Sequence, residues 1–236
     1  MTGPRTTFSL IFCLLFLLAV FLNTPVHAGC PRSARCSGTT GLRRDFNKTM
    51  VALIPSSIFL THLTSRAQAY MNLEYNITDS CNPTCSSLAL AVMADMNLTS
   101  SNWNNASFFI QRSKLLEFHR RVTLVYSQDL SQSLAELSRV LKLTTPHAYL
   151  KSLKDHLRTV KEWVTKAVKI DRELKGLPAL NTTAVQQHSF TPMRSTSLQS
   201  QSVTTVACFF SRCVLEDLYV ISNQMLVDFV KIKRGL

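Results

Sequence analysis

Cysteine and asparagine are the residues whose type and spacing carry recognisable chemistry in this chain. One of the seven cysteines, Cys13, lies in an apolar leader, which leaves an even set of six. An even number of cysteines in an oxidising compartment predicts disulfide bonds between Cys30, Cys36, Cys81, Cys85, Cys208 and Cys213. Asn-x-Ser/Thr triplets predict N-glycosylation, which requires the secretory pathway and an exposed backbone, at Asn47, Asn76, Asn97, Asn105 and Asn181.

Side chains that could catalyse a reaction or bind a metal do not form a familiar pattern. The histidines make neither a His-x-x-x-His pair nor a zinc spacing with cysteine: His62, His119, His147, His156 and His188. There is no Gly-rich phosphate loop and no Gly-x-Ser-x-Gly elbow. Carboxylates recur one helical turn from arginines, which favours ion pairs of Glu117, Asp129 and Glu136 with Arg120, Arg121 and Arg139. We therefore expect neither enzymatic activity, nor a cofactor, nor a metal, and we interpret His119 as a hydrogen-bonded core residue.

The amino-terminal residues have the pattern of a secretory signal peptide. Arg5 supplies positive charge, Phe8–Leu22 is an apolar run of 15 residues, and Val26-His27-Ala28 has the small-residue spacing of a cleavage site. A membrane anchor is the alternative, but a bilayer span needs about 20 apolar residues. The prediction is a signal peptide over 1–28, a single secreted domain over 29–236, and no membrane insertion.

The mature chain is strongly basic, with 25 basic against 14 acidic side chains and a net charge of +11. Such a charge could steer the protein toward acidic receptors or support weak binding to heparan sulfate. The alternative is an ordinary solvated basic face, since the basic residues of one helix are spread along it: Lys151, Lys154, Arg158, Lys161, Lys166 and Lys169. We do not expect a secreted chain to bind nucleic acid.

Apolar side chains recur at helical spacing in four segments, which predicts an all-α fold. The segments run over about 42–75, 107–143, 145–175 and 202–232, and the connection from 76 to 106 is predicted to be mostly surface loop. Pro55 should kink or split the first helix, while Thr145 and Pro146 suit the cap and first position of the third. The first stripe is Phe46, Met50, Ile54, Phe59, Leu63, Ala67 and Tyr70.

The lengths of the connections predict how the helices are arranged. The second and third helices are joined by two or three residues and should be antiparallel, whereas about 30 and about 27 residues join the other neighbours. Those long connections allow parallel pairs. The prediction is a monomeric, disulfide-stapled long-chain four-helix bundle with up-up-down-down topology, which is the architecture of helical cytokines and growth hormones.

Several short runs resemble one cytokine family. The run from Lys114 to Arg120, followed by Val122, is similar to the start of the second helix of that family. The spacing of Cys30 and Cys36 and the order of Cys213, Leu215 and Tyr219 are similar as well, and Val214-Leu215-Glu216-Asp217-Leu218 resembles one member's fourth helix. Over about residues 30–232 the chain resembles interleukin-6-type cytokines of the leukaemia inhibitory factor, oncostatin M and ciliary neurotrophic factor branch.

The resemblance implies a secreted signal that bridges class I cytokine receptor chains. The expected chains are glycoprotein 130 and a leukaemia inhibitory factor receptor type chain, whose pairing activates Janus kinase/STAT signalling. Two alternatives remain open, namely a growth-hormone-like ligand and a secreted helical carrier of lipid or another apolar ligand. A carrier needs a hollow core, whereas stripes of branched aliphatic side chains favour a dry packed one.

The cysteines depart from the family's pattern. There, the paired amino-terminal cysteines bond to two cysteines near the end of the third helix, but residues 146–175 here contain none. In an up-up-down-down bundle the end of the first helix and the start of the fourth share one pole. We therefore predict two bonds joining Cys81 and Cys85 to Cys208 and Cys213, with Cys81–Cys213 the better family match, and a third bond between Cys30 and Cys36.

The resemblance also implies two receptor-binding surfaces. The family's Phe-x-x-Lys motif at the start of the fourth helix is absent in register, because Val206 and Phe209 stand at its two positions. A shifted Phe209-x-x-Arg212 pair could replace it, or Phe209 and Phe210 could both be core. The second surface is expected on the outer faces of the first and third helices, with Trp163 either core or interface and with these contact residues: Thr64, Arg66, Gln68, Arg158, Glu162 and Thr165.

Overall fold

In the computed structural model the described residues are 34–78, 80–85, 87–96, 108–140, 148–179 and 202–235. Within these ranges every regular element is a helix and there is no strand. The chain divides into Met1–Gly38 and one compact unit, Thr39–Leu236, which holds all the helices below apart from the first residues of α2. No helix in the described ranges is long and apolar enough to cross a membrane. The predicted all-α fold is confirmed.

The helix bounds follow the predicted segments closely. Three long helices are α2 (Ala34–Glu74), α5 (Phe108–Val140) and α6 (Ala148–Leu174). The fourth segment is one continuous helical stretch made of α7 (Val203–Phe209), the π-helical η3 (Phe210–Leu215) and α8 (Glu216–Arg234). The predicted signal peptide, Thr145 and Pro146 lie outside the described residues.

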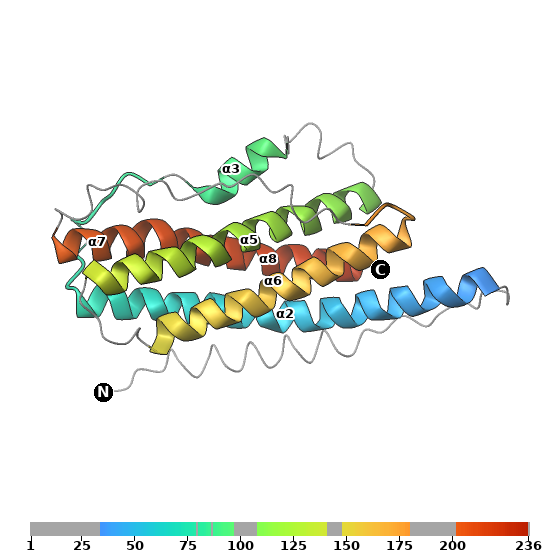
Figure 1. Cartoon of the computed structure of the whole chain (residues 1–236), viewed down its shortest axis with the longest axis horizontal. Coiled ribbons are helices and arrows are strands. Elements are labelled where there is room, and N and C mark those ends of the chain that lie inside the picture. The colour runs from blue at the N-terminus through green and yellow to red at the C-terminus, as the bar shows by residue number, and fades with distance from the viewer. Residues whose placement is uncertain are drawn as a thin grey trace. The chain divides into compact units, whose positions relative to one another are not determined.

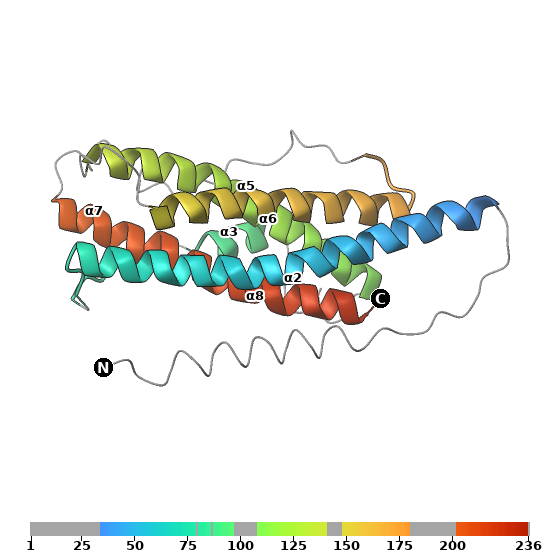
Figure 2. The same cartoon turned by 90° about the horizontal axis from the view of Figure 1, so that it is seen from below.

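Pro55 does not split the first helix. Helix α2 continues through it from Ala34 to Glu74, and the helix bends along its length in Figure 2. The ring of Pro55 lies on the exposed side, where the loss of one backbone hydrogen bond costs less than in the core. The helix ends at Glu74, and Asn76 in the following turn has a left-handed backbone (φ 49°), which asparagine tolerates better than most residues.

Polar contacts show which helices are neighbours and in which direction each pair runs. Helices α2, α5, α6 and α8 lie side by side in both ribbon views (Figures 1 and 2). Thr61 Oγ1 of α2 lies 2.9 Å from Ser222 Oγ of α8, and further along α2 Asn72 accepts a hydrogen bond of 2.6 Å from Ser211 of η3. Since the partner's number falls as the number in α2 rises, these two elements run antiparallel.

Helix α6 packs against both α2 and α5 and runs antiparallel to them. His156 Nε2 lies 2.8 Å from the carbonyl oxygen of Ser56, and the rings of Tyr149 and Tyr70 lie 6.1 Å apart between centres, so α6 also runs antiparallel to α2. At the other end of α6, Arg112 of α5 donates from Nε to Asp171 over 2.7 Å. The interior between the helices is filled by buried aliphatic and aromatic side chains from all of them.

The buried stripe of α2 changes phase in its second half, so part of the predicted stripe is wrong. Phe59 is 50% exposed and Tyr70 is only partly buried, whereas Ser57 and Thr64 are fully buried. Their hydroxyls donate to carbonyl oxygens four residues earlier, Ser57 to Leu53 over 2.9 Å and Thr64 to Leu60 over 2.8 Å. This local bond satisfies each hydroxyl inside the core, so the interior accepts two polar residues and turns two aromatic ones outward.

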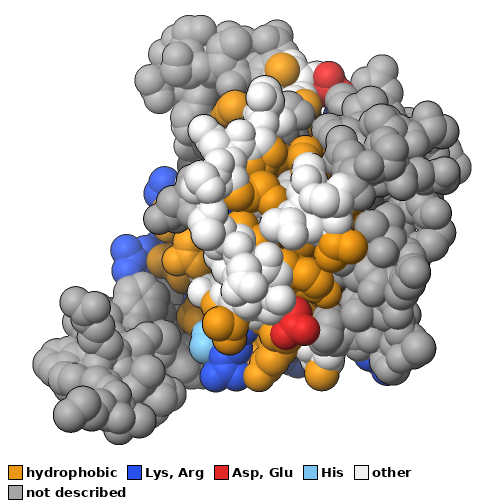
Figure 3. Space-filling model, turned by 90° about the vertical axis from the view of Figure 1, so that its left-hand side faces the viewer, with side chains coloured by type: hydrophobic (Ala, Val, Ile, Leu, Met, Phe, Trp, Pro, Cys, Tyr) orange, Lys and Arg blue, Asp and Glu red, His pale blue; other side chains and the backbone are white. Residues whose placement is uncertain are grey.

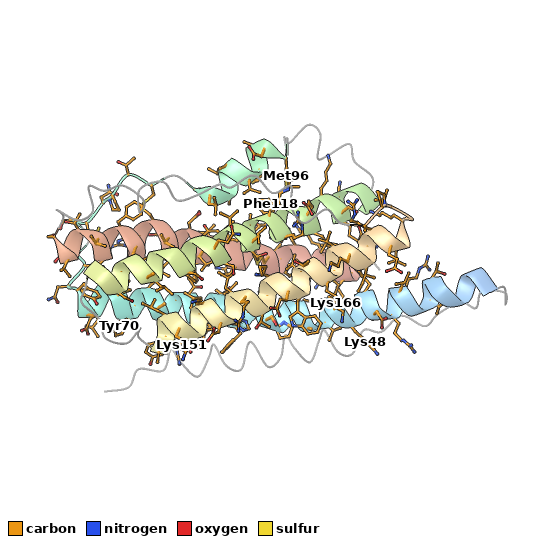
Figure 4. The ribbon with its side chains drawn as sticks, viewed as in Figure 1. Lys48, Tyr70, Met96, Phe118, Lys151 and Lys166 are labelled. Carbon is orange, nitrogen blue, oxygen red and sulfur yellow. A yellow bond between two sulfur atoms is a disulfide. The ribbon has the colours of Figure 1, made fainter. Side chains whose placement is uncertain are left out.

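A short helix, α3 (Leu88–Asp95), occupies the connection predicted to be mostly loop. Helix α3 packs on α5 and α8, and Figure 4 shows its neighbour Met96 beside Phe118 of α5. The carboxylate of Asp217 in α8 accepts hydrogen bonds from the Ser87 hydroxyl (2.8 Å), the Leu88 amide (3.0 Å) and the Tyr126 hydroxyl. A negative charge at a helix N-terminus is favourable, so Asp217 fastens α3 to the other helices.

Two disulfides tie the chain after α2 to the start of the last helical stretch. Cys81 bonds to Cys208 and Cys85 bonds to Cys213, with Cα–Cα separations of 6.2 and 5.2 Å. The prediction that these two pairs of cysteines are joined is confirmed, but the specific pairing Cys81–Cys213 is wrong. The predicted bond between Cys30 and Cys36 is not described, because Cys30 lies outside the described residues.

Two buried polar pairs cross the interior. Asp171, 2% exposed, accepts from Arg112 and from Ser113, and Lys175 Nζ lies 3.3 Å from its second oxygen. His119 is fully buried, as predicted for a core histidine, and its Nε2 lies 2.9 Å from the carboxylate of Asp228. Each pair links α5 to another helix, to α6 and α8 respectively, at a position where an unpaired charge would be costly.

Candidate functional site

The end of the molecule that holds the disulfides exposes apolar side chains. Together with the neighbouring Arg212, these side chains form what we call the disulfide-end surface, defined as Leu73, Val203, Phe209 and Arg212. Leu73 is 81% and Val203 44% exposed, while Phe209 and Arg212 are half-buried. Figure 3 looks onto this end and shows hydrophobic side chains gathered there. Phe210 is fully buried, so of the two adjacent phenylalanines one is core and the other, Phe209, lies at the edge of the core.

The π-helical turn of η3 shapes this surface. In an α-helix, residues five apart point about 140° away from each other. The i→i+5 hydrogen bonds of a π-helix bring such residues closer to one side. Cys208 and Cys213 are five apart and bond to the same short segment, 81–85. The widened turn therefore lets both disulfides form while it holds Phe209 and Arg212 between them.

A second surface follows the seam between α2 and α6. We call it the aromatic seam and define it as Phe59, Tyr70, Tyr149 and His156. The rings of Phe59 and His156 meet edge to face with centres 4.7 Å apart, and Tyr70 and Tyr149 lie 6.1 Å apart. Phe59 is 50% and Tyr149 44% exposed. These rings have few rotatable bonds and large contact area, which is typical of residues that dominate protein interfaces.

The hydroxyl of Tyr70 stays protonated under physiological conditions. Partial burial, followed by the nearby charge of Glu74 and by Tyr75, raises the pKa of Tyr70 to about 12. Burial and then Glu74 also raise the pKa of Tyr75. Tyr70 therefore gives the aromatic seam a neutral phenol group, which can both donate and accept hydrogen bonds.

The residues predicted for the surface of the first and third helices have mixed outcomes. Arg66, Arg158 and Glu162 are exposed, and Gln68 and Thr165 are half-buried. Thr64 is fully buried, so its predicted place on the outer face is wrong, for the reason given by its bond to Leu60. Other side chains join α2 to α6: His156 lies against Ser56 and Phe59, and Tyr149 lies against Tyr70.

Sequence reasoning missed Phe59 and Tyr149 as surface residues. Phe59 was assigned to the core because it fits a three-to-five spacing with its neighbours, and Tyr149 lies just before the stripe of α6. Two polar residues of α2, Ser57 and Thr64, mark the side that is buried. A stripe that includes both of them in the core places Phe59 on the surface. Trp163 is half-buried against the core, and the Lys166 ammonium lies 5.1 Å from its ring centre. One side of Trp163 therefore packs on the core, and the rest of it is at the surface.

Two of the predicted glycosylation sites are described. Asn47 and Asn76 are both exposed, the first on α2 and the second just after it. Asn97, Asn105 and Asn181 lie outside the described residues. A glycan on Asn47 or Asn76 would therefore meet solvent, as the triplets require.

The ionisable groups give structural pairs. Glu117 accepts hydrogen bonds of 2.7 Å from Arg120 and 3.0 Å from Arg121, as predicted. Burial pushes the pKa of Glu117 up, but the hydrogen bonds and charges of the two arginines outweigh it and leave this pKa below its ordinary value. Among the described residues no three His, Cys, Asp or Glu side chains are grouped so that they could hold a metal ion.

Comparison with known proteins adds no relative. No protein-family profile, no curated protein and no solved structure matches this chain.

Proposed function

We propose that this protein is a secreted cytokine of the interleukin-6 type, which signals by bringing two class I receptor chains together. In this proposal residues 1–28 are removed as a signal peptide. The mature domain is an up-up-down-down four-helix bundle, made of α2, α5, α6 and the continuous α7–η3–α8. The antiparallel neighbours of α2 and the disulfides, which are at home in an oxidising compartment, support this proposal.

One observation carries the proposal. A single packed unit presents two separate surfaces with exposed aromatic or apolar side chains, the aromatic seam and the disulfide-end surface. The aromatic seam joins α2 to α6 through Phe59 and Tyr70, whereas Phe209 and Arg212 belong to the last helical stretch, whose η3 segment contacts α2 at Asn72. A ligand that must be bound by two receptors at once needs two such surfaces on one rigid body.

The proposed mechanism involves no chemistry in this protein. The aromatic seam binds glycoprotein 130, and the disulfide-end surface binds a leukaemia inhibitory factor receptor type chain through Phe209 and Arg212. Tethering two membrane chains raises their effective concentration, so that their cytoplasmic Janus kinases phosphorylate each other and STAT proteins. The arrangement of Phe209 and Arg212, one aromatic and one cation near each other, is typical of interface hot spots.

Two double variants test the assignment of surfaces. Phe59→Ala with Tyr149→Ala should weaken binding to the glycoprotein 130 ectodomain by roughly tenfold or more and leave the other chain unaffected, because aromatic anchors dominate interface energies. Phe209→Ala with Arg212→Ala should have the opposite selectivity. Tyr219→Ala, which removes another exposed aromatic on α8, is the matched control. Surface plasmon resonance against both ectodomains gives the result, and equal losses for all three variants would refute the assignment.

A further inference from the structure

Basic side chains of two helices are placed at the same level. Arg44 and Lys48 on α2 and Lys166 and Lys169 on α6 are all exposed, and we call these four residues the basic strip. Arg112 fixes their level, because its guanidinium lies 5.1 Å from the ring centre of Phe46 and is bonded to Asp171. The first half of α2 is therefore beside the second half of α6.

Helix geometry brings the strip together. Lys48 follows Phe46 by two residues and Lys169 precedes Asp171 by two, and since the helices are antiparallel both lie about 3 Å further along in the same direction. Arg44 and Lys166 are each about one turn from the basic residue on their own helix. Figure 4 shows Lys48 on α2 and Lys166 on the neighbouring part of α6.

Within the described part of the chain, none of the four residues of the basic strip forms an ion pair. Lys166 lies over the ring of Trp163. Exposed carboxylates on the same helices are Asp45, Glu74, Asp155, Glu162 and Glu173. Three of them lie one helical turn from a lysine of the strip without pairing with it: Asp45, Glu162 and Glu173. The first half of α6 differs, because Arg158 there has a carboxylate partner in Asp155, 3.9 Å away.

We propose that the basic strip binds a sulfated polysaccharide, with the chain lying along the seam of α2 and α6. Four exposed cations on two neighbouring helices, none of which forms an ion pair within the described residues, match a linear polymer that carries sulfate groups at short intervals. The net charge of +12 would attract such a polyanion from a distance. The disulfides favour an oxidising, extracellular setting, where sulfated polysaccharides are the abundant linear polyanions. This site would retain the protein near cells, independently of any receptor.

The test is binding of a heparin-derived octasaccharide to the whole mature protein, measured by calorimetry over a range of salt concentrations. A variant with Lys48→Gln, Lys166→Gln and Lys169→Gln should bind at least about tenfold more weakly and with a smaller salt dependence, since each cation near a polyanion contributes separately. The control carries Lys151→Gln, Lys154→Gln and Lys231→Gln, which removes the same charge from exposed positions elsewhere. It should bind within about twofold of the parent, because screening weakens distant charges.

Three results would overturn the proposal. Equal losses in both variants would assign the binding to net charge alone, and unchanged binding in the strip variant would place the site elsewhere. If vesicles of phosphatidylserine and phosphatidylcholine bound and lost affinity with the strip variant while the octasaccharide did not bind, the strip would be a membrane surface. Circular dichroism and thermal unfolding check that both variants fold. If the triple strip variant fails to fold, Lys48→Gln alone replaces it and should weaken binding by a few-fold.

Discussion

Asp171 is where buried charges of α5 and α6 meet. It receives hydrogen bonds from Arg112 and Ser113 and has Lys175 nearby, all at a position only 2% exposed. Asp171→Asn keeps the shape of the side chain but leaves the buried guanidinium without its counter-charge. We expect a loss of roughly 3 kcal/mol in the free energy of unfolding, because breaking a buried ion pair strands the remaining charge. Chemical denaturation measures it.

Glu173→Gln is the control for Asp171, since it removes a carboxylate two residues away from an exposed position on the same helix. Its effect should stay within about 0.5 kcal/mol, as for most surface substitutions. If both variants lost the same stability, the cluster around Asp171 would have no special role.

Glu117 gives the protein an acid-sensitive contribution to stability. Its pKa is lowered from the ordinary value of 4.5 in spite of burial, because Arg120 and Arg121 favour the charged form. A depressed carboxylate pKa stabilises the fold above pH 4.5, and this contribution is lost as pH falls through the folded-state pKa. Glu117→Gln should therefore lower stability at pH 7 by up to about 1 kcal/mol and have a smaller effect at pH 3.

The measurement is the unfolding free energy of parent and variant from pH 7 to pH 3. Glu162→Gln, an exposed carboxylate on α6, should produce no such pH-dependent difference. A Glu117→Gln effect that is the same at both ends of the range would show that packing, not charge, is responsible.

Single residues show what the sequence could and could not predict. His119 was predicted to be in the core because it falls on the stripe of α5, and it is fully buried beside Asp228. Thr64 is expected on the outer face because it lies opposite the predicted apolar stripe, yet it is fully buried, and its hydroxyl is satisfied by a carbonyl oxygen of its own helix. Periodicity identifies apolar core positions well, but it does not distinguish a buried threonine from a surface one. The outward position of Phe59 was missed for the same reason.

At the scale of elements, α3 depends on a partner from α8. The amide of Leu88 and the hydroxyl of Ser87 both donate to Asp217. Asp217→Asn should loosen this cap, because hydrogen bonds to a charged acceptor are worth more than those to a neutral one. We expect hydrogen exchange of the amides in α3 to speed up by roughly tenfold or more while the middle of α5 keeps its protection.

Glu216→Gln removes the adjacent exposed carboxylate and serves as the control for α3. Hydrogen-exchange mass spectrometry would show unchanged exchange in α3 for this variant. If Asp217→Asn left the exchange of α3 unchanged, packing on α5 and α8 would be sufficient to hold the helix.

The long helices could be predicted from the sequence because a sustained stripe records which side is buried. Helix α3 could not, because eight residues are too few to show a period, and its only local signal is Ser87 before an apolar run. The joining of two pairs of cysteines was predictable from the pole that they share. Which cysteine bonds to which was not, because a shared pole does not distinguish the two members of each pair.

At the scale of the whole molecule, the account depends on the two surfaces being usable at the same time. The aromatic seam lies between α2 and α6, whereas Phe209 and Arg212 lie on the last helical stretch, and the proposal requires that two receptor chains bind there without obstructing each other. The buried clusters and the disulfides hold both surfaces on one packed unit. In the proposed mechanism this rigidity lets one bound receptor fix the position of the second.

The most direct measurement is the mass of the complexes formed when the purified mature protein is mixed with the ectodomains of glycoprotein 130 and a leukaemia inhibitory factor receptor type chain. The account predicts a species that contains one copy of each of the three, which is lost in the Phe59→Ala/Tyr149→Ala and Phe209→Ala/Arg212→Ala variants. Pairwise complexes without the three-component species, or no complex with either ectodomain, would contradict it.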